Sequence, residues 1–221
     1  MAFELEKEAL RREICHAAYQ IAQAGYVAAN DGNLSARCPD GHILITPTGV
    51  YKGDVQPEQL LEVTLEGQVI RDGGLGPSTE TPMHLALYQR WSDLGGVVHT
   101  HSPYALCMAS RGEDLTRPIT ADMVLLLGKI PCLPYLPLGT QELADRVAAA
   151  GESANGVLLA HHGACTWGRN LREAWYCTQA LEQYCRQLYL QLILGGAMPE
   201  IPAKEVEKLA ARRLASGTKR G

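Results

Sequence analysis

The sequence has no long hydrophobic run, no excess of positive charge and no signal-like N-terminus. Its longest apolar runs, such as 123–128, fall far short of the ~20 residues that cross a bilayer. Asp and Glu number 24 against 20 Lys and Arg, and basic residues form no cluster that would favour nucleic acid. The N-terminus mixes both charge signs, unlike a secretory signal. We therefore expect a cytoplasmic protein with neither a nucleic-acid nor a membrane partner.

Paired cysteine motifs are also missing. The chain has seven cysteines, an odd number without any Cys-x-x-Cys pair, at positions 15, 38, 107, 132, 165, 177 and 185. This pattern predicts reduced, buried thiols rather than disulfides. The chemistry of a site must then come from other polar side chains, and the seven histidines are the first candidates.

Predicted helices and strands alternate along the chain. We expect helices at 3–24, 78–90, 103–111, 141–150 and 170–195, and strands at 42–46, 60–65, 68–71, 96–101, 130–133 and 156–161. Because hairpins interrupt the alternation, the pattern favours an α/β fold with helices on both faces of a mixed or antiparallel sheet. No linker divides the chain, so we expect one domain over 1–221. Its tail, from about 203 to 221, should be helical and then fray.

Histidines at the ends of two apolar segments predict a metal site. His99 and His101 are two residues apart on a predicted strand, so both imidazoles point to one face. A second apolar segment ends in His161-His162 before Gly163. Either pair alone is also compatible with structural histidines. Together they suit a catalytic zinc site, which uses three protein ligands and leaves a position open, although Mn²⁺, Fe²⁺ or Co²⁺ would accept similar ligands.

A carboxylate precedes the first histidine pair. Ser78-Thr79-Glu80 opens a predicted helix that Ser78 or Thr79 would cap. Glu80 is either a carboxylate that interacts with the helix dipole or a fourth group of the metal site. His84 lies about one turn later, where it could support Glu80. Three histidines are not expected to bind the metal: His16, His42 and His84.

Five ordered motifs resemble the class II, zinc-dependent aldolase/adducin family, in particular its fuculose-phosphate aldolases. They are Asp31-Gly32-Asn33-Leu34-Ser35, Ile45-Thr46-Pro47-Thr48-Gly49, Pro77-Ser78-Thr79-Glu80, Val98-His99-Thr100-His101 and His161-His162-Gly163. The resemblance covers roughly residues 8–195. It implies a three-layer α/β/α fold with a largely antiparallel central sheet, in a homotetramer with active sites at subunit interfaces. It also implies reversible cleavage of a phosphorylated ketose into dihydroxyacetone phosphate and an aldehyde through a metal-stabilised ene-diolate.

The resemblance further implies which residues form the site. By motif position the metal ligands would be His99, His101 and His162, and Glu80 would bind the metal at rest and serve as acid/base during turnover. Residues at the family's phosphate-binding positions are Asn33, Thr48, Gly49, Ser78 and Thr79. The chemistry agrees, because three turns offer backbone N–H groups and hydroxyls to a dianion. No lysine lies within these motifs, so a Lewis-acid cation rather than a Schiff base would hold the enolate charge.

The match departs from known subfamilies at one position. Where fuculose-phosphate aldolases carry a tyrosine from a neighbouring subunit, this chain has Ala121-Asp122-Met123. Ribulose-phosphate 4-epimerases have an acid/base aspartate at a similar place, so Asp122 is a candidate general acid; otherwise it is a helix N-cap. Those epimerases, however, carry Asp in place of Glu80 and use a C-terminal tyrosine, and no tyrosine follows Tyr189. An aldolase is therefore the leading prediction, with epimerase, dehydratase or decarboxylase as the alternative and an adducin-like scaffold as a remote one.

Overall fold

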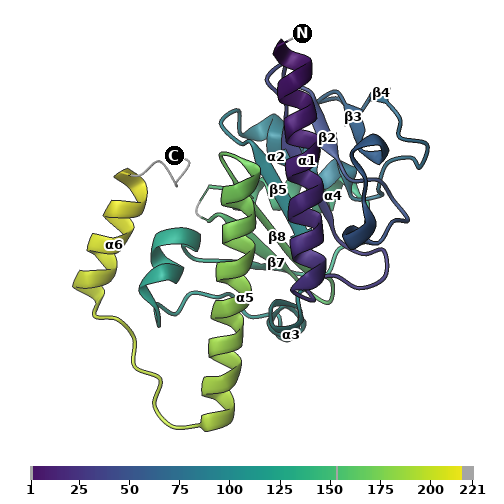
Figure 1. Ribbon diagram of the computed structural model, residues 1–221. Coiled ribbons are helices and arrows are strands. Elements are labelled where there is room, and N and C mark those ends of the chain that lie inside the picture. Colours follow the sequence, from purple (N-terminus) through teal and green to yellow (C-terminus); the bar gives the residue numbers. More distant parts are fainter. Residues whose placement is uncertain (1, 153, 216–221) are drawn as a thin grey trace.

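The computed structural model describes residues 2–152 and 154–215, and Figure 1 shows a sheet with helices on both of its faces. Its strands are β1 (Asn33–Arg37), β2 (Ile43–Ile45), β3 (Leu61–Val63), β4 (Val69–Arg71), β5 (Gly96–Thr100), β6 (Cys132–Leu133), β7 (Gly156–Leu159) and β8 (Gly163–Gly168). They form one eight-stranded sheet in the order β4-β3-β2-β1-β5-β8-β7-β6. Every neighbouring pair is antiparallel except β6 with β7. The predicted largely antiparallel sheet is confirmed.

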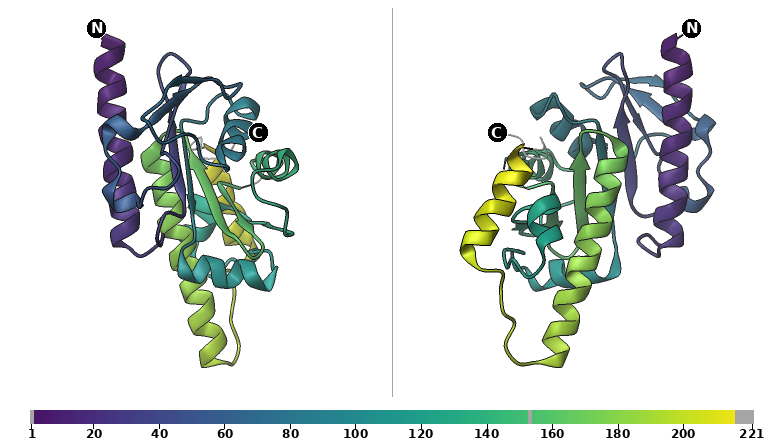
Figure 2. Two further views of the ribbon diagram at one scale, coloured as in Figure 1. Left: turned by 90° about the vertical axis from the view of Figure 1, so that its right-hand side faces the viewer. Right: turned by 60° about the vertical axis from the view of Figure 1, so that its left-hand side comes forward.

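Helices complete three layers. They are α1 (Ala2–Gln23), α2 (Thr81–Arg90), α3 (Pro103–Arg111), α4 (Gln141–Ala150), α5 (Leu171–Leu194) and α6 (Ala203–Ala215), with short helical turns η1 (Lys52–Asp54), η2 (Pro57–Gln59) and η3 (Met123–Leu127). Helices α1 and α5 cover one face of the sheet, and α2 and α4 cover the other (Figures 1 and 2). The predicted α/β/α layering is therefore confirmed. Among the described helices, none combines the length and apolarity needed to cross a membrane.

The alternation of side chains along β5 determines to which face of the sheet His99 points. Val98 packs in the core beneath α1 and α5, whereas Val97 packs in the opposite core with Tyr88 of α2. Because successive strand residues point to opposite faces, His99 falls on the same face as Val97. The fully buried side chain of His99 is thus directed toward Glu80 at the N-terminal end of α2.

Two strands were not predicted from the sequence. β1 follows directly after the Asp31-Gly32 turn, and β8 follows His162. β1 does not look like a buried strand because it contains Asn33 and Ser35, yet both are buried and hydrogen-bonded. Glycine begins and ends β8, which weakens the strand signal in the sequence.

The predicted cap of α2 is wrong. The helix starts at Thr81, and Glu80, not Ser78 or Thr79, occupies the N-cap position. The Ser78 hydroxyl instead accepts the backbone N–H of Glu80 at 3.2 Å, forming a separate turn before the helix. The Glu80 side chain makes no cap hydrogen bond, which leaves its carboxylate for other contacts.

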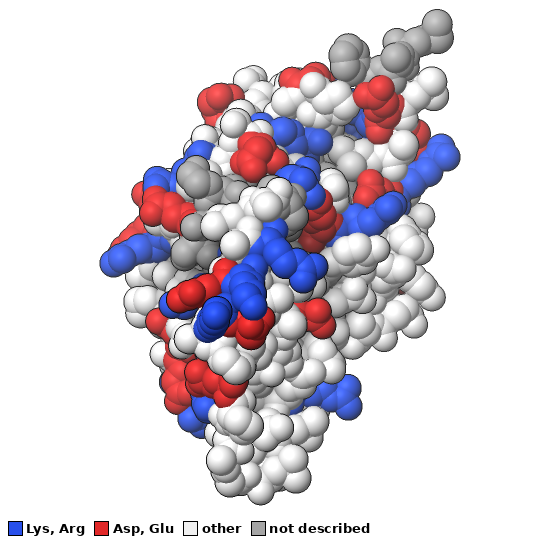
Figure 3. Space-filling model, turned by 90° about the vertical axis from the view of Figure 1, so that its left-hand side faces the viewer, with Lys and Arg blue, Asp and Glu red and all other residues white. Residues whose placement is uncertain are grey.

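The C-terminal part of the chain lies at the outer side of the molecule. The predicted helix in the tail is α6, and the predicted fraying beyond 215 lies outside the described residues. The end of α5 projects from the body, and Figure 3 shows a mostly uncharged surface at this lower end. Its exposed apolar side chains are Leu190, Leu192, Ile193 and Leu194.

Candidate metal centre

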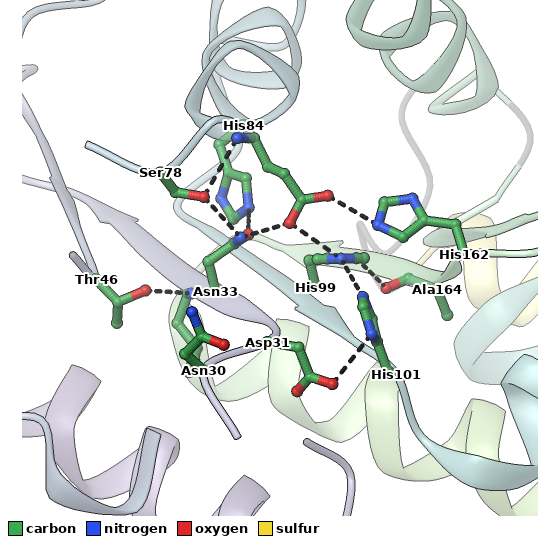
Figure 4. Close-up of polar contacts among 12 residues, drawn as sticks. Asn30, Asp31, Asn33, Thr46, Ser78, His84, His99, His101, His162 and Ala164 are labelled. Carbon is green, nitrogen blue, oxygen red and sulfur yellow. Dashed lines mark hydrogen bonds and ion pairs between the residues drawn. The ribbon is translucent and has the colours of Figure 1, made fainter. Parts of the chain in front are cut away.

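Three histidines from two strand ends meet at one place in the structure. His99 lies in β5, His101 directly follows β5, and His162 lies in the turn between β7 and β8. One ligand nitrogen of each lies within 4.8 Å of the others. Their ring centroids are 5.0 Å apart for His99 and His101, 4.7 Å for His99 and His162, and 5.2 Å for His101 and His162. The rings therefore surround a common point, as Figure 4 shows.

Glycine allows the strands to approach so closely. A Cβ on Gly163 would lie 2.5 Å from the carbonyl oxygen of Thr100 and 2.9 Å from Cδ2 of His101. Gly32 has φ +69°, and a Cβ there would lie 3.0 Å from the carbonyl oxygen of His99. Any side chain at either position would push the backbone away from the histidines. This explains physically why glycine follows His162 and precedes Asn33.

The structure distinguishes the two adjacent histidines. His161 adopts φ 59° in the β7–β8 turn and is exposed. The backbone N–H of His162 donates to Leu159 O at 3.0 Å, and its ring lies in the cluster. The apolar pattern alone did not distinguish the two histidines, and the family resemblance implied His162; the turn geometry places His162, not His161, in the cluster.

The hydrogen bonds of two rings suit metal binding. Nδ1 of His99 lies 2.9 Å from the carbonyl oxygen of Ala164, and Nδ1 of His101 lies 3.2 Å from Oδ2 of Asp31. If Nδ1 of each neutral ring carries the proton, both Nε2 atoms present lone pairs, and these atoms are 3.1 Å apart. Such facing lone pairs repel each other unless a cation lies between them. Carboxylate and carbonyl partners of this kind are typical of metal-binding histidines.

Glu80 completes the donor set. Its Oε1 lies 2.9 Å from Nε2 of His162, and its Oε2 lies 3.3 Å from Nε2 of His99. Oε2 also accepts a hydrogen bond from Nδ2 of Asn33 at 2.8 Å, whereas buried Oε1 receives none of proper geometry. Three imidazole nitrogens and an unsatisfied buried carboxylate oxygen fit Zn²⁺, and they also fit Mn²⁺, Fe²⁺ or Co²⁺.

The electrostatics of the cluster follow from burial and proximity. Burial would raise the pKa of Glu80, but the attraction of His99 and the close approach of the His162 and His99 rings hold it well below its ordinary value. Burial, with repulsion from His99, lowers the pKa of His101 to about 4. Against the effect of burial, Glu80 raises the pKa of His99. A metal ion would thus compete with a proton on His99.

Two of the three predicted anion-binding turns contact Glu80, and the third contacts the loop before Ser78. Asn33 donates to the hydroxyl of Ser78 at 3.3 Å as well as to Glu80. The backbone N–H of Thr48 donates to the carbonyl oxygen of Gly76 at 3.3 Å, which joins the second turn to the loop before Ser78. The remaining candidates, Gly49 and Thr79, are exposed beside these contacts. Since the Ser78 hydroxyl accepts hydrogen bonds from Asn33 and Glu80, its proton can be donated to a ligand.

Two supporting residues were not found from the sequence. Asp31, which contacts His101, also accepts the backbone N–H of Ala28 at 2.7 Å and so is held by its own loop. Lys52 is buried and donates from Nζ to the carbonyl oxygens of Asn30 (3.2 Å) and Val50 (2.8 Å). Burial lowers the pKa of Lys52 to about 8. Lys52 thereby ties together two of the turns, although it lies outside every motif that signalled the site.

Asp122 is not brought to this cluster within the chain. It occupies the N-cap position of η3, where it is exposed and makes no cap hydrogen bond. The cluster found among the described residues does not include it.

Comparison with known proteins matches this geometry to a family. The profile described as Class II Aldolase and Adducin N-terminal domain matches residues 12–189. The 5-deoxy-D-ribulose 1-phosphate aldolase of Bacillus thuringiensis serovar kurstaki is 33% identical over 210 residues, which cover 94% of this chain and 96% of that protein. The 3-oxo-tetronate 4-phosphate decarboxylase of Escherichia coli is 33% identical over 192 residues, covering 85% and 90%.

A solved structure gives the same result. An L-fuculose 1-phosphate aldolase superposes with a TM-score of 0.83 at 26% identity, covering 92% of this chain and 95% of that one. The family profile and the relatives span most of the sequence, and two of the five motifs supply the three histidines of the cluster. The chain therefore belongs to the class II aldolase and adducin family.

Proposed function

We propose that this protein is a metal-dependent aldolase that reversibly cleaves a ketose 1-phosphate, such as L-fuculose 1-phosphate, into dihydroxyacetone phosphate and an aldehyde. The observation that carries the proposal is the convergence of His99, His101, His162 and Glu80 beside three donor-rich turns. A relative and a structural neighbour named as sugar-phosphate aldolases support it.

The proton transfers follow from the placement of Glu80. His99, His101 and His162 would hold a divalent cation, which would supply a Lewis acid for the negative charge that C–C cleavage leaves beside a carbonyl. Glu80 is ionised and buried next to the ligands, so it can exchange a proton with the carbon of the dihydroxyacetone phosphate half. Its contact with Asn33 orients the carboxylate for this step.

The phosphate would be bound by groups that carry no full charge. Asn33, Ser78 and Thr79 lie next to Glu80, and Thr48 and Gly49 lie on the adjoining turn. Backbone N–H groups and hydroxyls of this kind bind dianions. This arrangement would place the phosphorylated end of the ketose beside the reacting carbons and leave the aldehyde half toward solvent or another subunit.

The proposal includes a second subunit. We propose a homotetramer in the cytoplasm in which Asp122 of a neighbouring copy exchanges a proton with the oxygen of the departing aldehyde. Its exposure and its distance in the fold from the cluster support delivery from another copy. The exposed apolar end of α5 offers a surface suited to subunit contact (Figure 3).

A decarboxylase is the second candidate. Loss of CO₂ from a 3-oxo acid phosphate leaves the same kind of enolate as aldol cleavage, so the same metal and phosphate sites would serve. The Escherichia coli relative favours this candidate. Epimerase and dehydratase chemistry would use the same groups, whereas a non-catalytic scaffold has no use for a complete donor set.

A substrate screen with a Glu80 variant tests the proposal. The zinc-loaded protein is assayed on phosphorylated ketoses and 3-oxo acid phosphates, with aldehyde, CO₂ and epimers measured separately by NMR. We expect aldehyde from a ketose 1-phosphate and a ~10²–10⁴-fold loss of kcat in Glu80→Gln. Glu58→Gln, which changes an exposed glutamate, is the matched control. A wild-type kcat in Glu80→Gln with metal bound would show that Glu80 is not the base. Formation of CO₂ or of an epimer without aldehyde would contradict the proposed aldolase activity.

A further inference from the structure

His84 is a buried histidine that the metal cluster does not use. It lies in α2 with no solvent exposure. Its Nε2 is 2.5 Å from Oδ1 of Asn33, and its Nδ1 is 2.7 Å from the hydroxyl of Ser35. The hydroxyl of Tyr88 lies 3.0 Å from the same Ser35 oxygen. Four buried side chains therefore connect α2 and β1 to the carboxylate of Glu80.

The position of each proton in this series of hydrogen bonds can be assigned, beginning at Glu80. A carboxylate only accepts hydrogen bonds, so the Asn33 atom 2.8 Å from Oε2 must belong to the amide NH₂ group. The amide oxygen of Asn33 then faces His84. Because that oxygen also only accepts, Nε2 of His84 must carry a proton.

The remaining assignments follow because His84 is neutral. Its ring is fully buried and its two nitrogens contact the uncharged side chains of Asn33 and Ser35, an environment that disfavours the imidazolium, and burial accordingly lowers its pKa to about 3. A neutral ring has one N–H, so Nδ1 is an acceptor and the Ser35 hydroxyl donates to it. The Ser35 oxygen can in turn accept from the hydroxyl of Tyr88. Each hydrogen bond in this series is thus donated in the direction of Glu80.

We propose that His84 is a positioning residue whose single neutral tautomer fixes the amide of Asn33, so that its N–H groups face Glu80 and Ser78. With the opposite tautomer, the protonless Nε2 would face the oxygen of Asn33. The amide would then favour a flipped orientation, with its oxygen against the Glu80 carboxylate. The His84 side chain acts on the metal centre through Asn33, because its ring nitrogens contact Asn33 and Ser35 rather than the side chain of a proposed metal ligand. The inference rests on the proposed role of Glu80.

NMR of the folded wild-type protein gives the most direct test. With ¹⁵N-labelled histidine, the His84 signals are identified by their loss in His84→Gln. We expect the Nε2–H tautomer, with no imidazolium form between pH 8 and pH 5. A majority Nδ1–H tautomer or an imidazolium signal in that range would overturn the assignment.

Two matched variants test the consequence for the metal site. In His84→Gln the amide nitrogen takes the place of Nε2 and still donates to Asn33, whereas in His84→Asn the shorter side chain cannot reach it. Zinc affinity is measured by competition with a chromophoric chelator. We expect about a tenfold loss in His84→Asn and less than a threefold loss in His84→Gln. Equal losses in the two variants would show a role in packing alone and overturn the proposal.

A further variant covers the case in which His84→Asn does not fold. Ser35→Ala removes the donor to Nδ1 and leaves the ring in place, so a mixture of tautomers and a smaller loss of zinc affinity are expected. An unchanged pure Nε2–H tautomer with unchanged affinity would overturn the proposal. These measurements use no substrate. A protein that fails to cleave any ketose phosphate but shows these effects would refute the aldolase and keep the role of His84.

Discussion

Two clusters in this protein bring a similar set of metal-binding atoms together, yet they differ in charge. The first comprises His99, His101 and His162 with Glu80, and the second comprises Asp40, His42 and Glu62. In the second cluster, Lys7 lies 2.6 Å from Oε1 of Glu62 and 2.5 Å from Oδ2 of Asp40, and Arg11 lies 3.2 Å from Oε2 of Glu62. In the first, the carboxylate of Glu80 pairs with histidines.

The difference shows that convergence of ligand atoms does not by itself indicate a metal site. Lys7 and Arg11 on α1 are buried and neutralise the acidic groups from the β2–β3 side of the sheet. The second cluster therefore binds a helix to the sheet. In the first cluster, the positive charge that would balance Glu80 and satisfy the facing imidazoles must come from protons or from a metal ion.

The largest expected effect separates the clusters by metal content. His101→Ala removes one of the proposed ligands. We expect about a 1000-fold loss of zinc affinity, which is a share of the ~10–16 kcal/mol that a zinc site can supply. His42→Ala, the matched control in the second cluster, should leave zinc affinity unchanged. Chelator competition and elemental analysis measure both. Loss of zinc in His42→Ala instead would mean that the metal binds at the second cluster.

A substitution in the second cluster should lower the stability of the fold and leave metal binding intact. Glu62→Gln leaves the buried Arg11 without its carboxylate partner, whereas Lys7 keeps Asp40, and removing one partner of a buried ion pair costs about 3 kcal/mol or more. Urea unfolding of the metal-free protein should show this loss, with wild-type zinc affinity retained at low urea. A Glu62→Gln protein as stable as wild type would mean that the second cluster contributes nothing to the attachment of α1.

Most of the fold could be predicted because its elements carry periodic signals. The pattern of apolar residues in α5 and the apolar runs of β5 and β7 made these elements visible in the sequence. The strand β1 was not visible, because Asn33 and Ser35 are buried by virtue of partners in α2 that are distant in sequence. Polar residues satisfied by tertiary hydrogen bonds give no local signal. The extent of the domain, 1–221, stays a prediction.

The site was predictable where spacing and motif coincided. The pair His99 and His101 follows from strand geometry, and the family motif added His162 and Glu80. Lys52 and Asp31 were missed because a buried lysine or a loop aspartate has many ordinary roles. Only the packing of distant turns shows what they contact. The role of Asp122 cannot be assigned from one chain, and it stays a prediction.

A smaller loss of zinc affinity is expected when the residue that supports His101 is replaced. Asp31→Ala removes the carboxylate 3.2 Å from Nδ1 of His101, and such outer partners are worth about tenfold or more in metal affinity. Asp31→Asn keeps an oxygen acceptor without the charge and should lose less. Chelator competition ranks the three proteins, and thermal melts of the metal-free forms reveal any damage to the loop. Equal affinity in wild type and Asp31→Ala would show that the loop alone holds His101.

Acid should separate the two clusters by pH range. His84 has a pKa of about 3 in the folded protein against 6.5 when unconstrained, so the unfolded chain takes up the proton first. Its contribution is complete above pH 6.5 and is lost as the pH falls toward 3, by at most about 1.4 kcal/mol per pH unit. Burial would raise the pKa of Glu62, but hydrogen bonds from Lys7 and His42 lower it, so its contribution is lost only below its ordinary value of 4.5.

Unfolding free energies of the metal-free proteins at several pH values test this separation. Between pH 6.5 and 4.5, Glu62→Gln should lose stability in parallel with wild type, whereas His84→Gln should follow a flatter course. Between pH 4.5 and 3 both variants should lose stability, because Glu62→Gln retains the loss that arises from His84 and His84→Gln retains the loss that arises from Glu62. These results would show that the folded protein holds His84 neutral beside the first cluster and Glu62 ionised within the second. If wild type and His84→Gln ran parallel from pH 6.5 to 4.5, the pKa of His84 would not be lowered in the folded protein, and its neutral tautomer would not persist below pH 6.5.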